Sequence, residues 1–356
     1  ELNIKLNNIS NFTFTESQVS GRNIENLIGA TQIPLGVAGP LLVNGKNFFI
    51  PLATTEGALV ASISRGCKAV TEAGGVTVLV EDVGITRGPV FKTKNLTHGV
   101  QVKKWVEENG KAIARVCEKT SNHLKLISTK ISFVGRNLYI RFQYHTSDAM
   151  GMNMATIATE EAVKLIEKQT GALCIALAGN FDIDKKPAWL NFIQGRGKKI
   201  WAEAILDKKV IRDVLKTTPE RIVEVVHTKN HLGSIMSGSL GFNGHFANII
   251  AAIFLATGQD PGHIVEGSLG ITTAEVLENG DLYFSIYLPS LVVGIVGGGT
   301  ELPTQQEAIN LLGVKKVVEF AESLGAATLA GELSLIASLA EGSLAKAHSK
   351  LGRRDK

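Results

Sequence analysis

Apolar residues recur along the chain at two spacings, one typical of helices and the other typical of strands. Between residues 54 and 75, Leu59, Ile63 and Val70 follow helical intervals and the run stops at a pair of glycines, so the pattern predicts a helix. Residues 25–45 are rich in glycine, proline and β-branched residues, which indicates turns and short strands. The chain therefore mixes helices and strands from early in its length.

Residues 90–180 have the pattern of a self-contained unit. The expected elements are a helix, a two-stranded hairpin, a second helix and a buried strand, at residues 100–120, 131–145, 158–171 and 172–181. The hairpin turns at residues 135–137, and Gly171 ends the second helix. This order of elements predicts an α+β sandwich.

The remainder, residues 188–356, alternates helices with strands such as residues 281–296 and closes with long helices. One of these helices is expected to open at the capping-box pattern formed by Thr304 and Glu307. Residues 1–24 are polar and loosely patterned, which indicates a small cap. The pattern thus divides the chain into a cap, an α+β unit and larger mixed regions.

Composition supports a soluble, reduced protein. With 356 residues, 44% of them hydrophobic, the chain can bury a large core and form two or three domains. It has no uninterrupted apolar run long enough to span a bilayer, and its N-terminal residues lack the basic-then-apolar order of a signal peptide. Cys67, Cys117 and Cys174 are widely spaced and odd in number, so we expect free thiols rather than disulfides or a zinc site. These features predict a cytoplasmic location.

Charge and missing motifs narrow the function. A net charge of +4 is mild, but 37 lysines and arginines make an anionic small molecule a reasonable partner. An aromatic share of 6% argues against nucleic acid, as does the confinement of clustered basic residues to the tail. The motifs GxGxxG after a strand, GxxxxGK[ST], HExxH, CxxC and GxSxG are absent, which excludes the commonest dinucleotide, phosphoryl-transfer, zinc-protease and hydrolase schemes.

Several charged residues stand where chemistry is possible, and each has an ordinary structural alternative. Lys185 and Lys186 follow Asp184 in an expected loop before a proline, although adjacent loop lysines are usually solvated surface. Glu56 falls at the first turn of the expected helix, where a carboxylate can be only a cap. Asp260 falls at a helix end, where the dipole disfavours an anion, so we expect it to have a specific partner.

His348, near the C-terminus, follows a helix of small residues and taken alone is typical of a surface histidine. Together with these residues, ten motifs resemble class I 3-hydroxy-3-methylglutaryl-CoA (HMG-CoA) reductases. They are ENLIGATQIPLGVAGPL, PLATTEGALVAS, TRGPV, GRNLYIRFQ, DAMGMNM, DKKPAWLNFIQGRGK, GFNGHFANI, GQDPGH, VGGGT and AGELSLIASLAEG, in family order. They cover nearly the whole catalytic portion, and the membrane anchor of the animal enzymes is missing, so the chain is similar to the soluble archaeal-type enzymes.

The resemblance implies a specific α+β architecture. A large mixed α/β domain that binds HMG-CoA is expected at residues 25–88 and 188–356. A small ferredoxin-like domain that binds the dinucleotide, with its connecting loop, is expected as an insertion at residues 89–187. A small helical cap is expected at residues 1–24. The segment ENLIG corresponds to the region through which family subunits pair, so the resemblance implies a homodimer with active sites at the subunit interface, alone or as a dimer of dimers.

The resemblance also implies a mechanism, in which HMG-CoA is reduced to mevalonate and CoA with two hydrides from two NADPH molecules. Lys185 would stabilise the oxyanion that forms when a carbonyl accepts hydride, and Glu56 would supply protons. Asp260 would link Glu56 and Lys185. His348 would protonate the departing CoA thiolate. No metal is required.

Binding residues are carried over in the same way. The resemblance implies contacts with the HMG group at Arg87, Asp184, Lys186, Lys229 and Asn248. It implies contacts with CoA at Ser62, Ser64, Arg65, Lys68, Lys216 and His245. It implies contacts with NADPH at Ser121, Asn122, Asp148, Met150, Gly151, Met152, Asn153, Gly297, Gly298 and Gly299.

The stretch SDAMGMNMAT, residues 147–156, holds three of the four methionines at the start of an expected helix. In the family this helix start receives the nicotinamide dinucleotide. The free N–H groups of a helix N-terminus can hold pyrophosphate, Gly151 permits close backbone approach and methionine gives soft apolar contacts. Filling of the hydrophobic core is the alternative explanation for these methionines.

Two positions depart from the family pattern. Ala178 stands where family members usually have a serine that contacts the HMG group, so one substrate hydrogen bond is lost or supplied by water. The serine–arginine pair that reads the 2′-phosphate of NADPH matches Ser121 and Asn122, with Lys125 close behind. NADPH remains the expected cofactor.

Three other functions stay open. An enzyme of the same fold could oxidise mevalonate with NAD, as class II enzymes can, and a comparison of NADPH with NADH would discriminate. A silent CoA-binding or scaffold protein should have lost one of the four catalytic residues, but all four are present. A CoA-thioester hydrolase would release CoA without any nucleotide.

Overall fold

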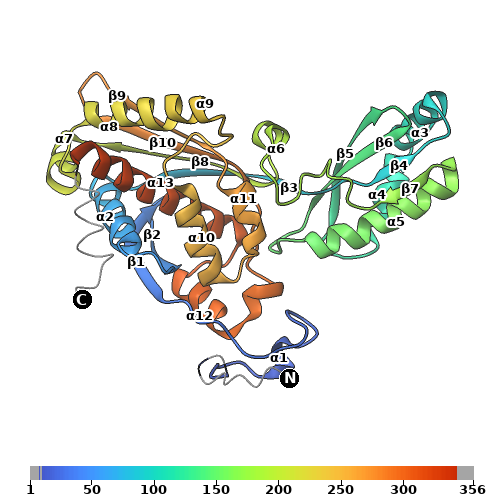
Figure 1. Cartoon of the computed structure of the whole chain (residues 1–356), viewed down its shortest axis with the longest axis horizontal. Helices are drawn as coiled ribbons and strands as arrows, with labels where there is room; N and C mark the ends of the chain where they lie inside the picture. The colour runs from blue at the N-terminus through green and yellow to red at the C-terminus, as the bar shows by residue number, and fades with distance from the viewer. Residues whose placement is uncertain (1–7, 9, 343–356) are drawn as a thin grey trace.

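Two lobes, each with its own hydrophobic core, make up the computed structural model, which describes residues 8 and 10–342 (Figure 1). One long strand, β3 (Thr77–Arg87), runs from the larger lobe into the smaller one (Figure 1). Its first part pairs with β8 (Gly197–Leu206) of the larger lobe, and its last three residues pair with β6 (Asn137–His145) of the smaller lobe. The lobes therefore share one sheet.

This sheet has eight strands in the order β7-β4-β6-β3-β8-β10-β9, with β5 paired to β6, and every pair is antiparallel. The register shifts between Asp82 and Gly84, where β3 passes from one lobe to the other. Gly84 has φ +77°, and a Cβ there would lie 2.4 Å from the carbonyl oxygen of Tyr144. Only glycine meets both requirements at this crossing point.

The larger lobe is built around α13 (Val317–Glu341), whose alanines and leucines pack into its core. This helix is long and apolar enough to cross a membrane, but 78% of its most apolar stretch is buried inside the protein. It is thus the core helix of this lobe, which contains further helices and strands. These are β1 (Leu35–Val43), β2 (Lys46–Ala53), α2 (Leu59–Glu72), α7 (Lys208–Val210), α8 (Pro219–Val225), α9 (Ser234–Ser237), α10 (Phe246–Thr257), α11 (Ile264–Gly267), β9 (Ile271–Val276), β10 (Leu282–Leu291) and α12 (Pro303–Leu312).

The smaller lobe follows the predicted order of elements. It contains β4 (Val90–Lys92), α3 (Leu96–Glu108), α4 (Gly110–Glu118), β5 (Lys125–Val134), β6, α5 (Met152–Thr170) and β7 (Leu173–Ala176). The hairpin of β5 and β6 and the end of α5 at left-handed Gly171 confirm the predictions. Helices α4 and α5 pack together and contact the sheet, which encloses the second core.

Some predicted elements were wrong in detail. The expected helix 100–120 is two helices, because the side-chain amide of Asn109 donates to the carbonyl of Trp105 and ends α3 there. The expected buried strand 172–181 is only the four-residue edge strand β7, in which Leu173 and Ile175 are 61% and 58% exposed.

Two predicted helix starts were also misplaced. Helix α12 begins at Pro303 with Leu302 as its N-cap, so Thr304 lies inside the helix and bonds to the side chain of Gln305 instead of capping. Helix α2 begins at Leu59. In the expected N-terminal cap, the helix among the described residues is the single turn α1 (Glu16–Val19).

Helices α2 and α13 meet at Gly66, which leads to a prediction about stability. A Cβ at Gly66 would lie 1.9 Å from the backbone carbonyl oxygen of Ala330, so Gly66→Ala must push the two helices apart. We expect a loss of roughly 1–3 kcal/mol or more in the free energy of unfolding, measured by urea titration. Gly110→Ala is the matched control, because a Cβ at this helical position meets no atom within 4 Å. An equal effect of both changes would contradict the tight helix crossing.

Candidate functional site

The side chains of Lys185 and Asp260 form a close ion pair, with Nζ of Lys185 2.6 Å from Oδ2 of Asp260. Lys185 lies in the loop between β7 and α6 (Trp189–Gln194), and Asp260 caps the 3₁₀ turn Pro261–His263 by accepting from the N–H of Gly262. The partner predicted for Asp260 is therefore confirmed. With side chains 43% and 33% exposed, the pair remains open to a ligand.

Electrostatics keep Asp260 ionised. Partial burial raises the pKa of Asp260, but the hydrogen bonds from Lys185 and from the N–H of Gly262, with the charges of His263 and Lys185, outweigh it and hold the pKa below its ordinary value. The carboxylate is thus negative at neutral pH and faces a lysine amine. Such a pair can orient an ammonium group toward a substrate oxygen.

Beneath this pair lies a fully buried carboxylate, Glu266, which the sequence analysis did not single out. Its Oε1 accepts hydrogen bonds from Nη1 of Arg196 at 2.7 Å and from Nδ1 of His263 at 2.6 Å. The same oxygen accepts from the backbone N–H of Lys185 at 3.2 Å, and Oε2 accepts from the side-chain amide of Asn191 at 3.0 Å. Four separate segments therefore meet at one carboxylate.

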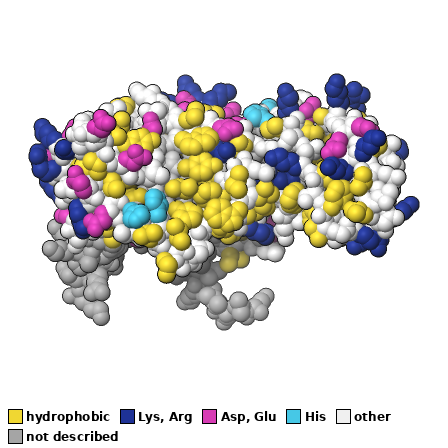
Figure 2. All heavy atoms as spheres, turned by 90° about the horizontal axis from the view of Figure 1, so that it is seen from above, with side chains coloured by type: hydrophobic (Ala, Val, Ile, Leu, Met, Phe, Trp, Pro, Cys, Tyr) yellow, Lys and Arg dark blue, Asp and Glu magenta, His cyan; other side chains and the backbone are white. Residues whose placement is uncertain are grey.

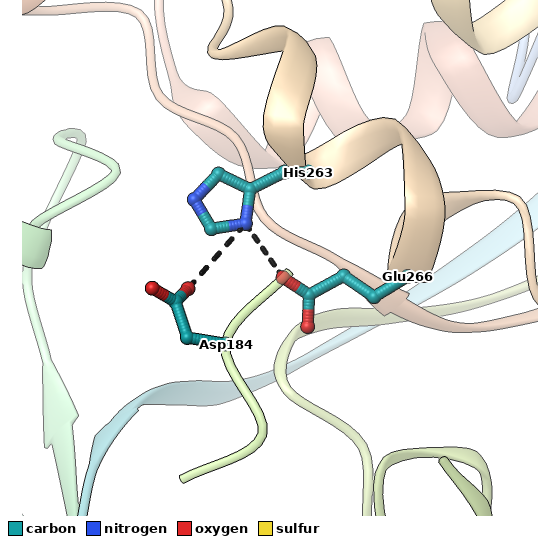
Figure 3. Close-up of side chains that lie close together, drawn as sticks. All are labelled: Asp184, His263 and Glu266. Carbon is teal, nitrogen blue, oxygen red and sulfur yellow. Dashed lines mark hydrogen bonds and ion pairs between the residues drawn. The ribbon is translucent and has the colours of Figure 1, made fainter. Parts of the chain in front are cut away.

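Asp184, His263 and Glu266 are also close enough to suggest a metal site (Figure 3). However, the guanidinium of Arg196 already bridges the two carboxylates, 3.0 Å from Oδ1 of Asp184 and 2.7 Å from Oε1 of Glu266. The short contact between Nδ1 of His263 and Glu266 needs a proton on the nitrogen, whereas a metal needs its lone pair. This arrangement suits an ion-pair network in which arginine supplies the positive charge.

Glu56 is placed differently from the prediction. It lies in the turn before α2, two residues ahead of the N-cap Ala58, and is exposed. It is therefore not a helix cap, and its backbone N–H donates to Oγ1 of Thr54. Among the described residues, no contact joins its side chain to Lys185 or Asp260, so the predicted link through Asp260 is absent within one copy of the chain.

Of the residues expected to bind the HMG group, Arg87 lies where β3 enters the smaller lobe, and Lys229 and Asn248 lie in the larger lobe. Arg87, at the end of β3, pairs with Asp182 at 3.3 Å and donates to Oγ1 of Thr156 on α5. Lys229 lines a cavity of about 440 Å³, and Asn248 lies on α10. Lys186 is exposed, and its amine donates to the carbonyl of Asp184.

The cavity beside Lys229 is polar. It is lined by Pro187, Lys229, Gly233, Ser234, Ser237, Ser239, Leu240, Gly241, Asn243, Gly244, His245, Ala247, Ser268 and Leu269. Pro187 is two residues from Lys185, and Ser268 is two residues from Glu266, so the cavity adjoins the buried network along the chain. Its hydroxyls, amide and lysine suit a polar, anionic ligand.

Residues expected to contact CoA are partly occupied within the protein. On α2, Oγ of Ser62 and Nε of Arg65 both bond to Oγ of Ser334 on α13, at 3.0 Å and 3.1 Å. Burial lowers the pKa of Arg65, although the charge of Glu341 opposes this effect. The ring of His245 bonds to the carbonyl of Gly331. Of the others, Lys68 makes an exposed ion pair with Glu72, and Ser64 and Lys216 lie on or after helices of the same lobe.

A second buried carboxylate, Glu332 on α13, holds the loop around His245. It accepts from the backbone N–H groups of Gly244 and His245, from the amide of Asn230 and from the hydroxyl of Thr272. The only sequence signal for Glu332 is a lone charge in an otherwise apolar helical stretch. Glu266 lacks even this signal, because polar and apolar residues alternate irregularly around it in the sequence.

The start of α5 suits an anion, and its methionines pack against the core of the smaller lobe. The helix begins at Met152 with left-handed Gly151 as N-cap and no side-chain cap, and a Cβ at Gly151 would lie 2.3 Å from the side chain of Thr146. Met150, Met152 and Met154 all pack against the core of the smaller lobe. The methionines therefore contribute to core packing, and their contact with a cofactor stays a prediction.

Asp148, which was expected at the cofactor, makes a contact between the lobes. Its Oδ1 accepts from the N–H of Val317 at the start of α13, at 2.8 Å, and its carbonyl accepts from the N–H of Ile295. The short side chain of an aspartate at a helix N-terminus is favoured by the helix dipole, which explains this choice. Lys316 adds a longer ion pair at 3.7 Å.

The remaining cofactor candidates lie on three surface segments. Ser121 and Asn122 form the turn between α4 and β5, and the hydroxyl of Ser121 bonds to the sulfur of Met154 on α5. Asn153 is exposed in the first turn of α5. Gly297, Gly298 and Gly299 form a turn in which a Cβ at either of the first two would meet open space. His348 lies outside the described residues.

Comparisons with known proteins identify the family of this chain. The profile of the family described as hydroxymethylglutaryl-coenzyme A reductase matches residues 1–353. The 3-hydroxy-3-methylglutaryl-coenzyme A reductases of Methanocaldococcus jannaschii and Methanothermobacter thermautotrophicus are 53% and 52% identical, over 99% and 98% of this chain and 90% of each relative.

Solved structures agree at the level of the fold. The class II 3-hydroxy-3-methylglutaryl-CoA reductase of Streptococcus pneumoniae, bound to NADPH in open conformations, gives a TM-score of 0.74 at 19% identity, covering 89% of this chain and 87% of that one. Since the family profile and the archaeal relatives both extend over almost the entire sequence, the chain belongs to the hydroxymethylglutaryl-coenzyme A reductase family.

Proposed function

We propose that this protein reduces HMG-CoA to mevalonate and CoA, with NADPH as the source of both hydrides. Beyond family membership, one observation carries the proposal: the amine of Lys185 lies 2.6 Å from an ionised Asp260 and stays partly exposed, close along the chain to a polar cavity. An ammonium held this way can neutralise the oxyanion that develops each time a carbonyl accepts hydride. Asp260 holds the amine in position through the ion pair.

The other steps need protons at two positions. The oxygen that becomes the final alcohol must be protonated after the second reduction, and we assign this to Glu56. The CoA thiolate must be protonated as it leaves the thiohemiacetal, and we assign this to His348. Because Glu56 does not reach Lys185 within one copy, a site completed by a second copy is part of the proposal.

The residues of the smaller lobe fit a nicotinamide dinucleotide. When bound, the nicotinamide supplies hydride to the substrate carbonyl. The uncapped N-terminus of α5 offers N–H groups to a pyrophosphate, and the open glycine turn 297–299 leaves room for a flat ring. Asn122 stands where the family has an arginine for the 2′-phosphate, and exposed Lys125 close behind it is the cation that we propose for this group in NADPH. We therefore propose that the smaller lobe, within residues 89–187, binds the dinucleotide, and that the larger lobe binds HMG-CoA.

An exposed apolar surface supports pairing of two copies. Leu79 on β3 lies opposite Trp201 on β8, which lies opposite Tyr287 on β10, and the rings of Trp201 and Tyr287 stack with centroids 5.5 Å apart. Tyr287 contacts Phe192, and Phe192 contacts the half-exposed Trp189 on α6. Figure 2 shows hydrophobic side chains gathered over the middle of one face of the molecule. We propose a cytoplasmic homodimer.

An assay with purified protein tests the proposed function. NADPH oxidation should begin on addition of HMG-CoA, with about two NADPH consumed per CoA released, because a thioester needs two hydrides to become an alcohol. NADH at the same concentration should react more slowly. Release of CoA without nucleotide would indicate a thioester hydrolase, and faster reaction of mevalonate with NAD would indicate the oxidative enzyme.

Ala178, which replaces the usual family serine, gives a prediction about substrate affinity. Ala178→Ser should add one hydrogen bond to the HMG group and lower the KM for HMG-CoA by a factor of about 2 to 10, equivalent to about 0.5–1.5 kcal/mol. Steady-state kinetics would measure it, with Ala176→Ser on the exposed strand β7 as the control. An unchanged KM in both variants would mean that position 178 does not face the substrate.

A further inference from the structure

The buried carboxylate of Glu266 connects the two segments that carry the Lys185–Asp260 pair. On one side it accepts the backbone N–H of Lys185, and on the other it accepts Nδ1 of His263, three residues after Asp260 in the same turn. Lys185 is held with φ +57°, the left-handed region that a lysine rarely adopts. This left-handed conformation is strained, and it persists only if the surrounding structure holds it. The hydrogen bond from the N–H of Lys185 to the fixed carboxylate of Glu266 supplies such a restraint.

Glu266 is itself fixed by the protein around it. Arg196, whose side chain has no exposed surface, pairs with it at 2.7 Å and also donates to Oγ1 of Thr86 at 2.9 Å. Asn191 on α6 binds Oε2 of Glu266 and also donates to the carbonyl of Ile183, two residues before Lys185. The carboxylate therefore cannot move without disturbing β3, β8 and α6.

His263 extends this support toward Asp260. The bond from Nδ1 to Glu266 fixes the ring, and Nε2 then faces Oδ2 of Asp260 at 3.7 Å (Figure 3 shows the ring beside Glu266 and Asp184). Nε2 is buried and has no hydrogen-bond partner among the described residues. At 3.7 Å from Oδ2, this nitrogen packs beside the Asp260 carboxylate without a hydrogen bond, so the ring that Glu266 fixes limits where that carboxylate can lie.

We propose that Glu266, with His263 as its partner, is a positioning residue that sets the distance and orientation of Lys185 relative to Asp260. The inference rests on the proposed function for its consequence in catalysis, but its geometric part does not. The carboxylate of Glu266 bonds to the backbone of Lys185 and makes no hydrogen bond or ion pair with the side chains of Lys185 or Asp260 among the described residues. It acts by holding the backbone of Lys185 and the turn of Asp260 in one rigid frame.

Glu266→Gln tests the proposal, since it keeps the shape and removes the negative charge that gathers these donors. We expect kcat to fall about 10- to 100-fold for HMG-CoA and for added mevaldehyde alike, because a small displacement of a catalytic group has effects of this size. KM should change much less. Glu332→Gln is the matched comparison, a carboxylate with the same full burial and four donors that holds the His245 loop, and it should instead raise the KM for HMG-CoA.

A second measurement does not depend on turnover. The amine of Lys185 is shielded by Asp260, so its acylation by acetic anhydride, followed by peptide mass spectrometry, should speed up in Glu266→Gln relative to that of Lys46, an exposed lysine paired with Glu319. An unchanged ratio in the folded variant, or wild-type kcat, would overturn the positioning role. If wild-type protein failed to oxidise NADPH, only the proposed function would be rejected, and the labelling ratio would still decide the inference.

If circular dichroism shows that Glu266→Gln does not fold, the more conservative variant His263→Asn tests the proposal instead. Asparagine can place an amide N–H near the Nδ1 position, which keeps a donor to Glu266, but it removes the ring nitrogen beside Asp260. We expect a smaller loss of kcat than for Glu266→Gln, with faster labelling of Lys185. Wild-type values for both quantities in His263→Asn would overturn the proposal.

Discussion

Lys185→Ala should lower kcat for the reduction of HMG-CoA, and equally for mevaldehyde, by about 100- to 1,000-fold, the usual effect of removing one donor that stabilises an oxyanion. Both reductions are affected because each passes through an oxyanion. Binding of HMG-CoA should survive, since Lys185 is not among the residues that line the cavity beside Lys229 and His245. Steady-state NADPH oxidation on the two substrates, with binding followed by calorimetry, measures these quantities.

The control for this variant is Lys46→Ala, which also removes a lysine from an ion pair, at 3.2 Å from Glu319, but far from the candidate site in the sequence and on exposed surface. It should leave both rates close to those of the wild type. Mevaldehyde reduction near the wild-type rate in Lys185→Ala would show that another group stabilises the oxyanion.

His348→Gln should abolish most reduction of HMG-CoA while sparing reduction of added mevaldehyde. General acid catalysis contributes about 100- to 10,000-fold, and only the first substrate has a thiolate to expel. A histidine with a pKa near its reference value of about 6.5 can donate a proton close to neutral pH, which glutamine cannot. The measurement is the pair of NADPH-oxidation rates on the two substrates for the same variant.

His227→Gln, at an exposed histidine outside the proposed site, controls for the loss of an imidazole. Equal losses on HMG-CoA and mevaldehyde in His348→Gln would argue against a role in protonating the thiolate. They would instead place His348 in a step common to both substrates, such as closure of the site.

Periodicity predicted the elements that are governed by local sequence. The β5–β6 hairpin was found where it was expected, and so was the helix with Leu59, Ile63 and Val70 on its buried face, although this helix begins later than predicted. The break at Asn109 depends on one side-chain hydrogen bond, and the exposure of β7 depends on its place at the sheet edge. Neither property changes the pattern of apolar residues, so periodicity could not reveal them.

The sequence predicted those parts of the candidate site in which a charged residue stands at an unusual position within a family motif. An aspartate at a helix end needs a partner, and Lys185 proved to be that partner for Asp260. Glu266 and His263 could not be found in this way, because their importance comes from segments that are distant in the sequence and meet only in the fold. For the same reason, the contact of Asp148 with α13 was not anticipated.

The shared strand has a consequence for the order of folding. Strands β3 and β8 pair antiparallel through residues as distant as Thr77 and Glu203, with the whole smaller lobe between them in the sequence. Closing so long a loop costs chain entropy before the pairing returns any energy, and such non-local contacts form slowly. A smaller lobe that is already folded brings its own ends together, with Gly84 opposite Gly197, and so acts as a rigid turn of the hairpin. We therefore expect the smaller core to form first and to nucleate the sheet of the larger lobe.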